Sequence, residues 1–318
     1  MSRQESLEIA VSAEIPLISK SYFSEKYIEK QIESILKQEN AEAITLIVRN
    51  DGSKDRTLDI LREIQKDHSN VEIINGPNLG LVASFFKLLN CAVEREFDFY
   101  SFCDQDDYWL PEKLTVAVNA INGEKEACMY AACSKLTDGD LVETGSITQT
   151  QCREITFYNA AIQNFCPGHN QVMNHKMAEV VMRHTKVGPA IYSQDLWITN
   201  IASLTGKIIF DNTPHVLYRQ HTNNQLSYGK SRIGWVKDHI NRLKKSEGKK
   251  FSVQLKYFAE CFDEYLNDEQ RKELEHYFSS LSSFSKRLEY IFRTKLYRQK
   301  PVETLLFKLI YLFGGYNI

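Results

Sequence analysis

The first 110 residues alternate between apolar runs typical of buried strands and segments whose apolar residues recur at helical spacing. The expected strands lie near residues 7–22, 43–48, 71–74 and 99–103. Between them, apolar residues three and four apart predict amphipathic helices that begin near residues 24, 55 and 81. Because strands and helices alternate, the sequence predicts an α/β fold with a mostly parallel sheet and right-handed crossovers.

The pattern changes twice after residue 110. Further strands are expected at 127–132, 207–210 and 215–218, and residues 134–160 are expected to form loops and turns. From residue 231, charged residues are frequent and apolar residues again recur at helical spacing. We therefore expect an α/β domain over 1–228, with halves of about 1–125 and 126–228, and a helical C-terminal domain over 229–318.

An acidic motif lies where the fourth expected strand ends. Three carboxylates, Asp104, Asp106 and Asp107, fall within four residues directly after an apolar run. Carboxylates this close repel one another unless a cation or hydrogen-bond donors lie between them, which favours a hard divalent cation, Mg²⁺ or Mn²⁺. The alternative is a solvated acidic turn before a helix, because such short motifs also occur by chance.

Polar residues also follow the second and third strands, at Asp51 and Asn78. The carboxyl ends of parallel strands meet at one edge of a sheet, so we expect Asp51, Asn78 and Asp104 to lie side by side there. Open α/β sheets bind their ligands in the crevice beyond that edge. The sequence therefore predicts a functional site at this edge.

Composition limits the class of protein, its partners and its cellular compartment. A hydrophobic content of 43% and a charged content of 25% are typical of a globular protein, and a net charge of −2 gives no argument for a nucleic-acid partner. Charge is uneven, because residues 231–318 hold 17 Lys and Arg against 11 Asp and Glu. Seven scattered cysteines predict reduced thiols, and no apolar leader or membrane span is visible, so we expect a cytoplasmic protein.

Several motifs together resemble those of the family 2 inverting glycosyltransferases. They are the segments 49–57 (RNDGSKDRT), 78–80 (NLG) with Ser84-Phe85, and 103–113 (CDQDDYWLPEK). The resemblance covers roughly residues 15–228 and is closest to the bacterial rhamnosyltransferase-like group that builds surface polysaccharides. It implies a GT-A fold, a donor half and an acceptor half, a nucleotide diphosphate sugar donor linked to UDP or dTDP, and a lipid-linked or protein-linked glycan acceptor.

The resemblance implies roles for the donor-side residues. Asp51 is expected to hydrogen-bond the nucleobase, and Asn78 and Gly80 to let the backbone approach the nucleotide. Asp104 is expected to contact the ribose or a metal-bound water, and Asp106 to coordinate Mn²⁺ or Mg²⁺ directly, with Asp107 orienting these ligands. From the residues alone, Asp51 also fits an Asx turn, and Asn78 and Gly80 fit an ordinary turn before a helix.

Two later motifs supply the remaining roles that the resemblance implies. In the segment 191–197 (IYSQDLW), Asp195 is the expected general base, and the alternative is a helix N-cap. In the segment 219–224 (RQHTNN), His221 is expected to bind the metal or to donate a hydrogen bond to the diphosphate, and Arg219 is expected to contact a phosphate oxygen. A structural role is the alternative for His221.

The first motif departs from the family pattern. Relatives end the first strand with a small residue, Thr or Ser, Tyr, Asn and a second small residue, whereas residues 20–24 read KSYFS and follow a strand interrupted by Pro16. Tyr22 remains a candidate for stacking on the base. A further histidine, His169, lies in a glycine-containing segment that resembles the acceptor-side loop, and we interpret it as a plain polar loop residue.

The C-terminal run 305–313 (LLFKLIYLF) is apolar nearly all round. We interpret it as packing against the protein's own core or another subunit. The alternative is peripheral contact with the inner face of the membrane, with nearby basic residues on phospholipid. For the whole chain, the alternatives to a metal-dependent glycosyltransferase are a non-catalytic sugar-nucleotide or partner-binding subunit and, less favoured, a nucleotidyltransferase.

Overall fold

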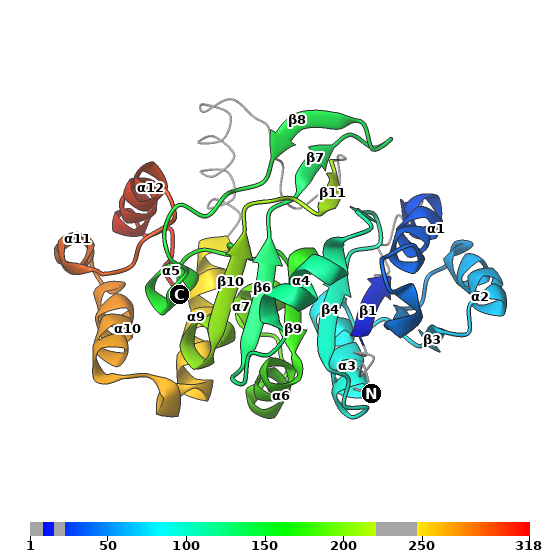
Figure 1. The fold of residues 1–318 in the computed structure, drawn as a ribbon. Helices are drawn as coiled ribbons and strands as arrows, with labels where there is room; N and C mark the ends of the chain where they lie inside the picture. The colour runs from blue at the N-terminus through cyan, green and yellow to red at the C-terminus, as the bar shows by residue number, and fades with distance from the viewer. Residues whose placement is uncertain (1–8, 16–22, 221–246) are drawn as a thin grey trace. The chain divides into compact units, whose positions relative to one another are not determined.

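The computed structural model describes residues 9–15, 23–220 and 247–318 (Figure 1). These residues form two compact units, each assembled from separate segments of the chain. The first unit comprises Met1–Thr150, Cys166–Arg183 and Gly206–Leu226, and the second comprises Gln151–Phe165, His184–Thr205 and Ser227–Ile318. The domain boundary predicted between residues 228 and 229 lies outside the described residues and stays a prediction.

A seven-stranded sheet forms the centre of the first unit, in the order β10-β6-β9-β4-β1-β2-β3. β9 runs antiparallel to both of its neighbours, and the other adjacent pairs are parallel, which confirms the predicted mostly parallel sheet. The strands are β1 (Ile9–Ile15), β2 (Ile44–Asn50), β3 (Val71–Asn75), β4 (Phe99–Cys103), β6 (Cys128–Ala132), β9 (Val172–Asn174) and β10 (Lys207–Asp211).

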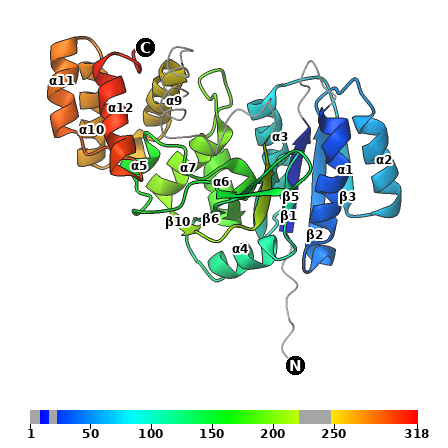
Figure 2. The ribbon, with the colours of Figure 1, turned by 90° about the horizontal axis from the view of Figure 1, so that it is seen from above.

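Helices cover both faces of this sheet, with α1 and α2 on one side and α3 on the other (Figure 2). Alternate residues of β4 show why both faces are apolar. Phe99 and Cys103 belong to the core that includes apolar residues of α1 and α4, whereas the Phe102 ring lies 5.3 Å from that of Phe85 in α3. The helices are α1 (Phe23–Leu36), α2 (Thr57–Asp67), α3 (Leu81–Val93), α4 (Lys113–Ile121) and α6 (His175–His184).

A second, four-stranded sheet in the first unit has the order β5-β11-β7-β8. Its strands are β5 (Tyr108–Trp109), β7 (Lys135–Thr137), β8 (Glu143–Ile147) and β11 (Val216–Arg219). The prediction that 134–160 contains only loops and turns is therefore wrong. All five residues of β8 are exposed, so the strand lacks the apolar alternation by which strands are recognised in a sequence.

Helices dominate the second unit, as predicted for the C-terminal part of the chain. They are α5 (Phe157–Ala160), α7 (Gln194–Thr205), α9 (Glu247–Cys261), α10 (Asp268–Ser280), α11 (Phe284–Arg293) and α12 (Pro301–Leu312). Aromatic rings fill its core, where Tyr290 lies between Tyr277 and Tyr311 at ring distances of 5.9 and 4.9 Å. Among the described residues, no helix is both long and apolar enough to cross a bilayer. All seven cysteines are free thiols, as predicted.

Candidate active site

The acidic motif forms the turn between β4 and β5, so its two ends belong to different sheets. β5 pairs with β11, and the Trp109 backbone N–H donates to Ser34 Oγ of α1 at 3.1 Å. These contacts anchor the residues after the turn, while β4 anchors those before it. The turn is thereby held at the carboxyl edge of the main sheet, where the sequence predicts the site.

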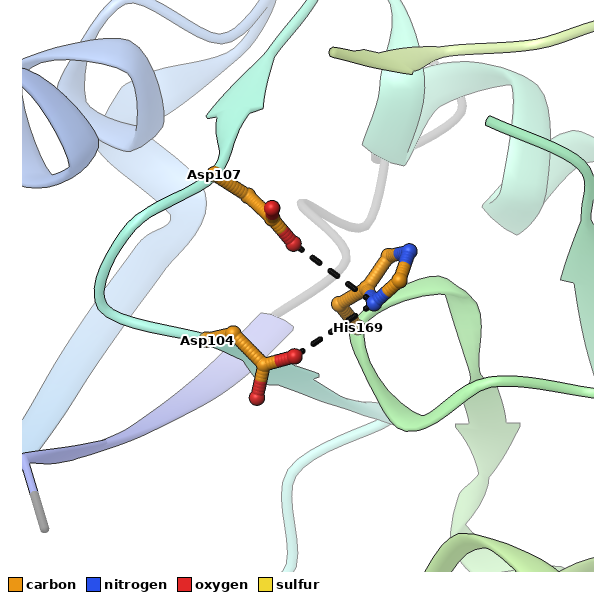
Figure 3. Close-up of side chains that lie close together, drawn as sticks. All are labelled: Asp104, Asp107 and His169. Atoms are coloured by element: carbon orange, nitrogen blue, oxygen red, sulfur yellow. Dashed lines mark ion pairs between the residues drawn. The ribbon is translucent and has the colours of Figure 1, made fainter. Parts of the chain in front are cut away.

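Two of the acidic side chains converge on a histidine from a distant segment (Figure 3). His169 Nδ1 lies 3.4 Å from Asp104 Oδ2 and 3.5 Å from Asp107 Oδ2. The ligand atoms of the three residues lie within 4.8 Å of one another. A small divalent cation with bonds of about 2.1 Å holds neighbouring ligand atoms about 3 Å apart, so this cluster can hold a metal ion after small side-chain adjustments.

Strand pairing explains why His169 reaches the acidic turn. β9 runs antiparallel to β4 with Ser101 opposite Val172 and Phe99 opposite Asn174. Continuing this register beyond the strands places Asp104 level with His169, which lies on the 3₁₀ turn Gly168–Asn170. The interpretation of His169 as a plain polar loop residue missed this placement. A short apolar strand directly after the loop was the available signal, but its partner strand was not evident.

Asp107 is fully buried, and its carboxylate oxygens make no hydrogen bond of good geometry with the described residues, although the Arg219 backbone N–H lies close enough to favour the charged form. Burial raises the pKa of Asp107 well above its ordinary value and the charges of Asp106 and Asp104 raise it further, whereas the backbone N–H and the charge of Arg219 partly oppose the shift. A buried carboxylate is costly when its hydrogen bonds are weak, whereas a bound cation would favour its charged form. The donor set of two carboxylates and an imidazole therefore fits Mn²⁺ or Mg²⁺.

A second layer of polar contacts holds the His169 ring. Its Nε2 lies 3.0 Å from Ser134 Oγ, which also accepts a hydrogen bond from Asn170 Nδ2 at 2.7 Å. The ring stacks on Tyr218 of β11 with a centroid distance of 5.0 Å. Partners of this kind fix the orientation of a metal-ligating histidine.

A buried lysine, Lys113 at the start of α4, is a further charged group near the turn that the sequence analysis missed. Its Nζ lies 3.4 Å from the centroid of the Trp109 ring and donates to Ser101 Oγ at 3.2 Å. Ser101 Oγ donates in turn to the Gln171 carbonyl oxygen at 3.1 Å, two residues after His169. Burial lowers the pKa of Lys113 to about 7, and the Asp107 charge opposes part of this shift.

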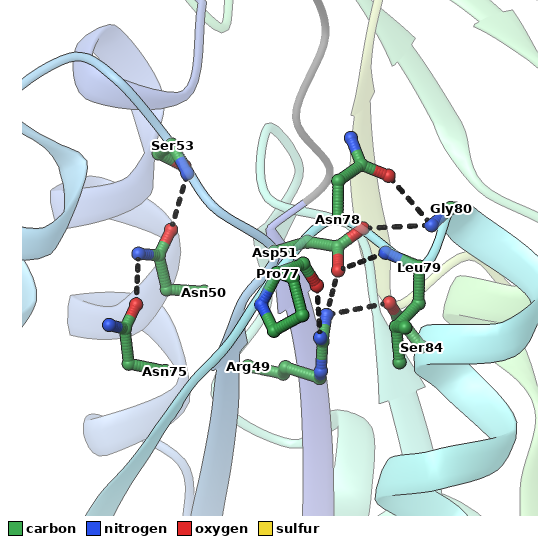
Figure 4. A network of polar contacts seen from close by, with 10 residues as sticks. All are labelled: Arg49, Asn50, Asp51, Ser53, Asn75, Pro77, Asn78, Leu79, Gly80 and Ser84. Carbon is green, nitrogen blue, oxygen red and sulfur yellow. Dashed lines mark hydrogen bonds and ion pairs between the residues drawn. The ribbon is translucent and has the colours of Figure 1, made fainter.

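On the donor side, Asp51 organises the loop before α3 (Figure 4). It is fully buried, pairs with the Arg49 guanidinium and accepts hydrogen bonds from the backbone N–H groups of Leu79 at 2.8 Å and Gly80 at 3.0 Å. Arg49 also donates to Ser84 Oγ at 2.8 Å and the Pro77 carbonyl oxygen at 2.6 Å. This network ties the end of β2 to residues 77–80 and to α3.

The sequence left two alternatives open here, an Asx turn at Asp51 and an ordinary turn at Asn78 and Gly80, and the structure gives a different answer for each. The Asx-type bond of the 50–53 turn is made by Asn50, whose Oδ1 accepts from the Ser53 N–H at 3.1 Å. Gly80 has φ +81°, a conformation that favours glycine, and its N–H also donates to Asn78 Oδ1 at 2.8 Å. Asn78 and Gly80 thus form a defined turn before α3, and their predicted nucleotide contact stays a prediction.

Asp195 lies in the first turn of α7, in the second unit. Its Oδ2 accepts a hydrogen bond from Asn164 Nδ2 at 2.8 Å, and its Oδ1 accepts from the Leu196 N–H at 2.9 Å and from the Ser193 hydroxyl. Ser193 in turn contacts Gln254 of α9, whose Oε1 accepts from the Ser193 N–H at 3.1 Å. The carboxylate is therefore held in one orientation by side chains and backbone together.

The remaining residues predicted for the site are Arg219, Asp106, Tyr22 and His221, and the structure describes only the first two. Arg219 is buried at the end of β11, donates through Nη1 to the Gly139 carbonyl oxygen at 2.7 Å and stacks over Tyr27. Asp106 lies on the acidic turn but outside the cluster of Asp104, Asp107 and His169. Tyr22 and His221 lie outside the described residues, so their expected roles stay predictions.

Comparison with known proteins identifies the family of the chain. The model of the family described as Glycosyl transferase family 2 matches residues 17–181. The dTDP-rhamnosyl transferase RfbG of Shigella flexneri is 25% identical over 214 residues, which cover 65% of this chain and 72% of that protein. A chondroitin synthase of Escherichia coli is 26% identical over 204 residues, 59% of this chain but only 29% of that protein.

Solved structures show the same fold. TarS 1-349 of S. aureus, in complex with UDP-GlcNAc, has a TM-score of 0.55 at 16% identity, and the match covers 98% of this chain and 90% of that chain. The mannosyltransferase PcManGT of Pyrobaculum calidifontis, in complex with GDP-Man and Mn²⁺, has a TM-score of 0.51 at 15% identity over 97% of this chain and 85% of that chain. These likenesses confirm the GT-A fold that the sequence predicts. Since the family model spans about half of the sequence, the chain belongs to glycosyl transferase family 2, where it is similar to the rhamnosyltransferase-like enzymes.

Proposed function

We propose that this transferase moves a hexose, with inversion, from a nucleotide diphosphate sugar linked to UDP or dTDP to a hydroxyl group of a growing glycan. The observation that carries the proposal is the cluster of Asp104, Asp107 and His169 at the carboxyl edge of the sheet. UDP-GlcNAc is bound by the structurally similar TarS, and dTDP-rhamnose chemistry is named for RfbG, which supports these two donor nucleotides.

Asp104, Asp107 and His169 would hold Mn²⁺ or Mg²⁺, and Asp106 and His221 are proposed as further ligands from their motifs. The bound ion would neutralise the negative charge that develops on the departing diphosphate. Within the chain, Ser134 and Tyr218 orient the histidine, and Lys113 in its protonated form would offset part of the charge of Asp107. The set of two carboxylates and an imidazole, in which the buried Asp107 carboxylate makes no hydrogen bond of good geometry, supports this assignment.

We propose Asp195 as the general base that removes the proton of the acceptor hydroxyl. The oxygen then attacks the anomeric carbon from the face opposite the leaving group, which inverts the configuration. Asn164 Nδ2 on Oδ2, and the Ser193 hydroxyl and Leu196 N–H on Oδ1, keep the carboxylate in a fixed orientation, as a base requires. On the donor side, we assign nucleotide contacts to Tyr22, Asp51, Asn78, Gly80 and Arg219.

A donor panel tests the proposal. Purified protein with Mn²⁺ or Mg²⁺ is incubated with UDP-glucose, UDP-galactose, UDP-N-acetylglucosamine and dTDP-rhamnose, and free nucleotide diphosphate is measured. We expect metal-dependent release from one donor, lost in Asp106→Ala and retained in Asp59→Ala, the same change at an exposed aspartate on α2. Calorimetry of the same donors follows if no release occurs. Metal-dependent binding without turnover, even with glycan acceptors, would identify a binding subunit instead.

The proposed base has its own test. Asp195→Asn keeps the size of the side chain, so we expect unchanged donor binding by calorimetry and a turnover about 10²- to 10⁴-fold lower. Asn164→Ala removes one hydrogen bond to the same carboxylate and should lower turnover by a smaller factor. Full turnover in Asp195→Asn would exclude Asp195 as the base.

A further inference from the structure

The last two helices expose a large apolar surface. Phe284, Leu288 and Phe292 recur at four-residue spacing on α11, and they are 51%, 40% and 80% exposed. On α12 and directly after it, exposed apolar side chains recur at three- and four-residue spacing, at Val302, Leu305, Leu309 and Phe313. We call these seven side chains the apolar face.

The two rows belong to one surface. α11 and α12 pack against each other, and the rings of Phe284 and Phe313 lie 6.3 Å apart (Figure 2). The same helices bury their opposite sides in the second unit, where Tyr290, Phe307 and Tyr311 are at most 1% exposed. The apolar face is therefore additional to the residues that these helices need for folding. Contiguous apolar surface of this kind marks a binding surface.

The segment that carries the apolar face is mostly basic. Residues 284–318 contain seven Lys and Arg but only two acids, Glu289 and Glu303. Both acids form ion pairs with cations of the same segment, since Glu289 contacts Arg293 at 3.0 Å and Glu303 contacts Arg298 at 3.5 Å. In the part of the chain that the structure describes, no carboxylate lies within 4.0 Å of Lys286, Lys300 or Lys308.

We propose that the apolar face docks on an anionic phospholipid surface. Exposed phenylalanines enter the interface between head groups and acyl chains, and the basic residues of the same segment attract the anionic head groups. Charge complementarity favours lipid over a second copy of the chain, because a symmetric contact through this face would bring like-charged lysines together. The inference adds a location to the proposed activity and does not depend on the donor or the acceptor.

Vesicle sedimentation of the full chain tests the proposal. One set of vesicles contains phosphatidylcholine alone, and the other contains phosphatidylcholine mixed with phosphatidylglycerol. We expect binding to the anionic vesicles, weakened by salt, and little binding to the neutral ones. The triple variant Lys286→Glu, Lys300→Glu, Lys308→Glu should bind about 100-fold more weakly. Its matched control reverses three exposed lysines of the first unit, Lys30, Lys87 and Lys125, and should bind like the wild type.

A second variant isolates the apolar contribution. Phe292→Ser with Phe313→Ser should lower vesicle binding at least about tenfold at low and high salt, because each change removes a largely exposed ring and not a core residue. Val142→Ser, at a 63% exposed residue of the first unit, is the control. Thermal unfolding checks that all variants fold, and donor hydrolysis in solution reports the proposed function separately.

Several outcomes would overturn the proposal. One is absence of binding to anionic vesicles, and another is binding that neither variant weakens. A third is a dimer, detected by light scattering, that dissociates in the double phenylalanine variant while vesicle binding is absent. That last outcome would assign the apolar face to self-association.

Discussion

At the scale of single residues, the site places a buried carboxylate and a buried ammonium around one acidic turn. Burial favours the neutral form of each group, which raises the pKa of Asp107 and lowers the pKa of Lys113. The Asp107 charge partly offsets the shift of Lys113, and the Arg219 charge partly offsets the shift of Asp107, because opposite charges favour one another's ionised forms. A divalent cation would add to this balance at Asp107, so the metal-free and metal-bound proteins should differ in stability.

Replacing Asp107 separates these contributions. Asp107→Asn keeps the shape of the side chain but removes the buried charge, so the metal-free variant should be about 1–3 kcal/mol more stable than the wild type at neutral pH. Because the pKa of Asp107 is raised in the folded wild type, its contribution to stability is present at low pH and is lost as pH rises. The advantage of Asp107→Asn over the wild type should therefore shrink on acidification. Thermal unfolding with and without Mn²⁺ measures both effects. Equal stabilisation of variant and wild type by Mn²⁺ would exclude Asp107 as a ligand.

Lys113 gives a pH dependence of opposite sign. Its folded pKa of about 7 lies below the ordinary value of 10.5, so between these values the unfolded chain binds a proton that the folded protein lacks. Stability attributable to Lys113 therefore rises with pH over this range, by up to about 1.4 kcal/mol per unit. Urea unfolding at several pH values should show this slope as the difference between wild type and Lys113→Met. Parallel profiles of the two proteins would contradict the lowered pKa.

At the scale of secondary-structure elements, pairing between β4 and β9 assembles the metal-ligand cluster. The two strands are about 70 residues apart in sequence, and their antiparallel register brings His169 level with Asp104. β10 closes the same sheet beside β6, and its start requires a close approach at Gly206. A Cβ atom there would lie 2.3 Å from the Ala127 carbonyl oxygen and 2.7 Å from Met177 Cε.

The close approach at Gly206 is testable. Gly206→Ala should lower the free energy of unfolding by at least about 2 kcal/mol, because the backbone of β6 or β10 must move to admit the methyl group. Gly188→Ala is the control, since a Cβ there meets nothing closer than 3.9 Å. Chemical denaturation compares the two variants. Similar stability in both would contradict the packing at this strand end.

At the scale of the whole molecule, the second unit has an aromatic core of its own. Tyr311 of α12 is fully buried, contacts the Ser280 hydroxyl at 2.6 Å and donates to the Tyr277 carbonyl oxygen at 2.5 Å. The interpretation that the C-terminal run packs against the protein's own core therefore holds for one side of α12. The other side carries part of the apolar face.

Two neighbouring aromatic residues distinguish the sides of this segment. Tyr311→Ala should lower the free energy of unfolding by about 3–5 kcal/mol, because it leaves a cavity and unpaired polar groups in the core. Phe313→Ala should change it by less than about 0.5 kcal/mol, because the Phe313 ring is 76% exposed. Denaturant unfolding of both variants measures the difference. A comparably large loss in Phe313→Ala would place that ring in a core.

The residues that sequence analysis could place are those with local signals. The order of strands and helices in the main sheet follows from apolar periodicity, and the acidic turn follows from three carboxylates after a buried strand. Asp104 and the organising position of Asp51 at the sheet edge were accessible for this reason, as was the family through its motif series. The proposed roles of Asp106, Asp195 and His221 rest on the same motifs.

The sequence by itself determined the α/β class, the edge of the sheet that carries the site, and the acidic residues there, because period and motif are local properties of a chain. Only the tertiary structure decided that His169 faces Asp104, that Lys113 is buried behind the turn, and that β8 joins a second sheet. It also decided which side of the C-terminal helices remains exposed. These features depend on contacts between distant segments, and no local pattern encodes which distant partner a residue will meet.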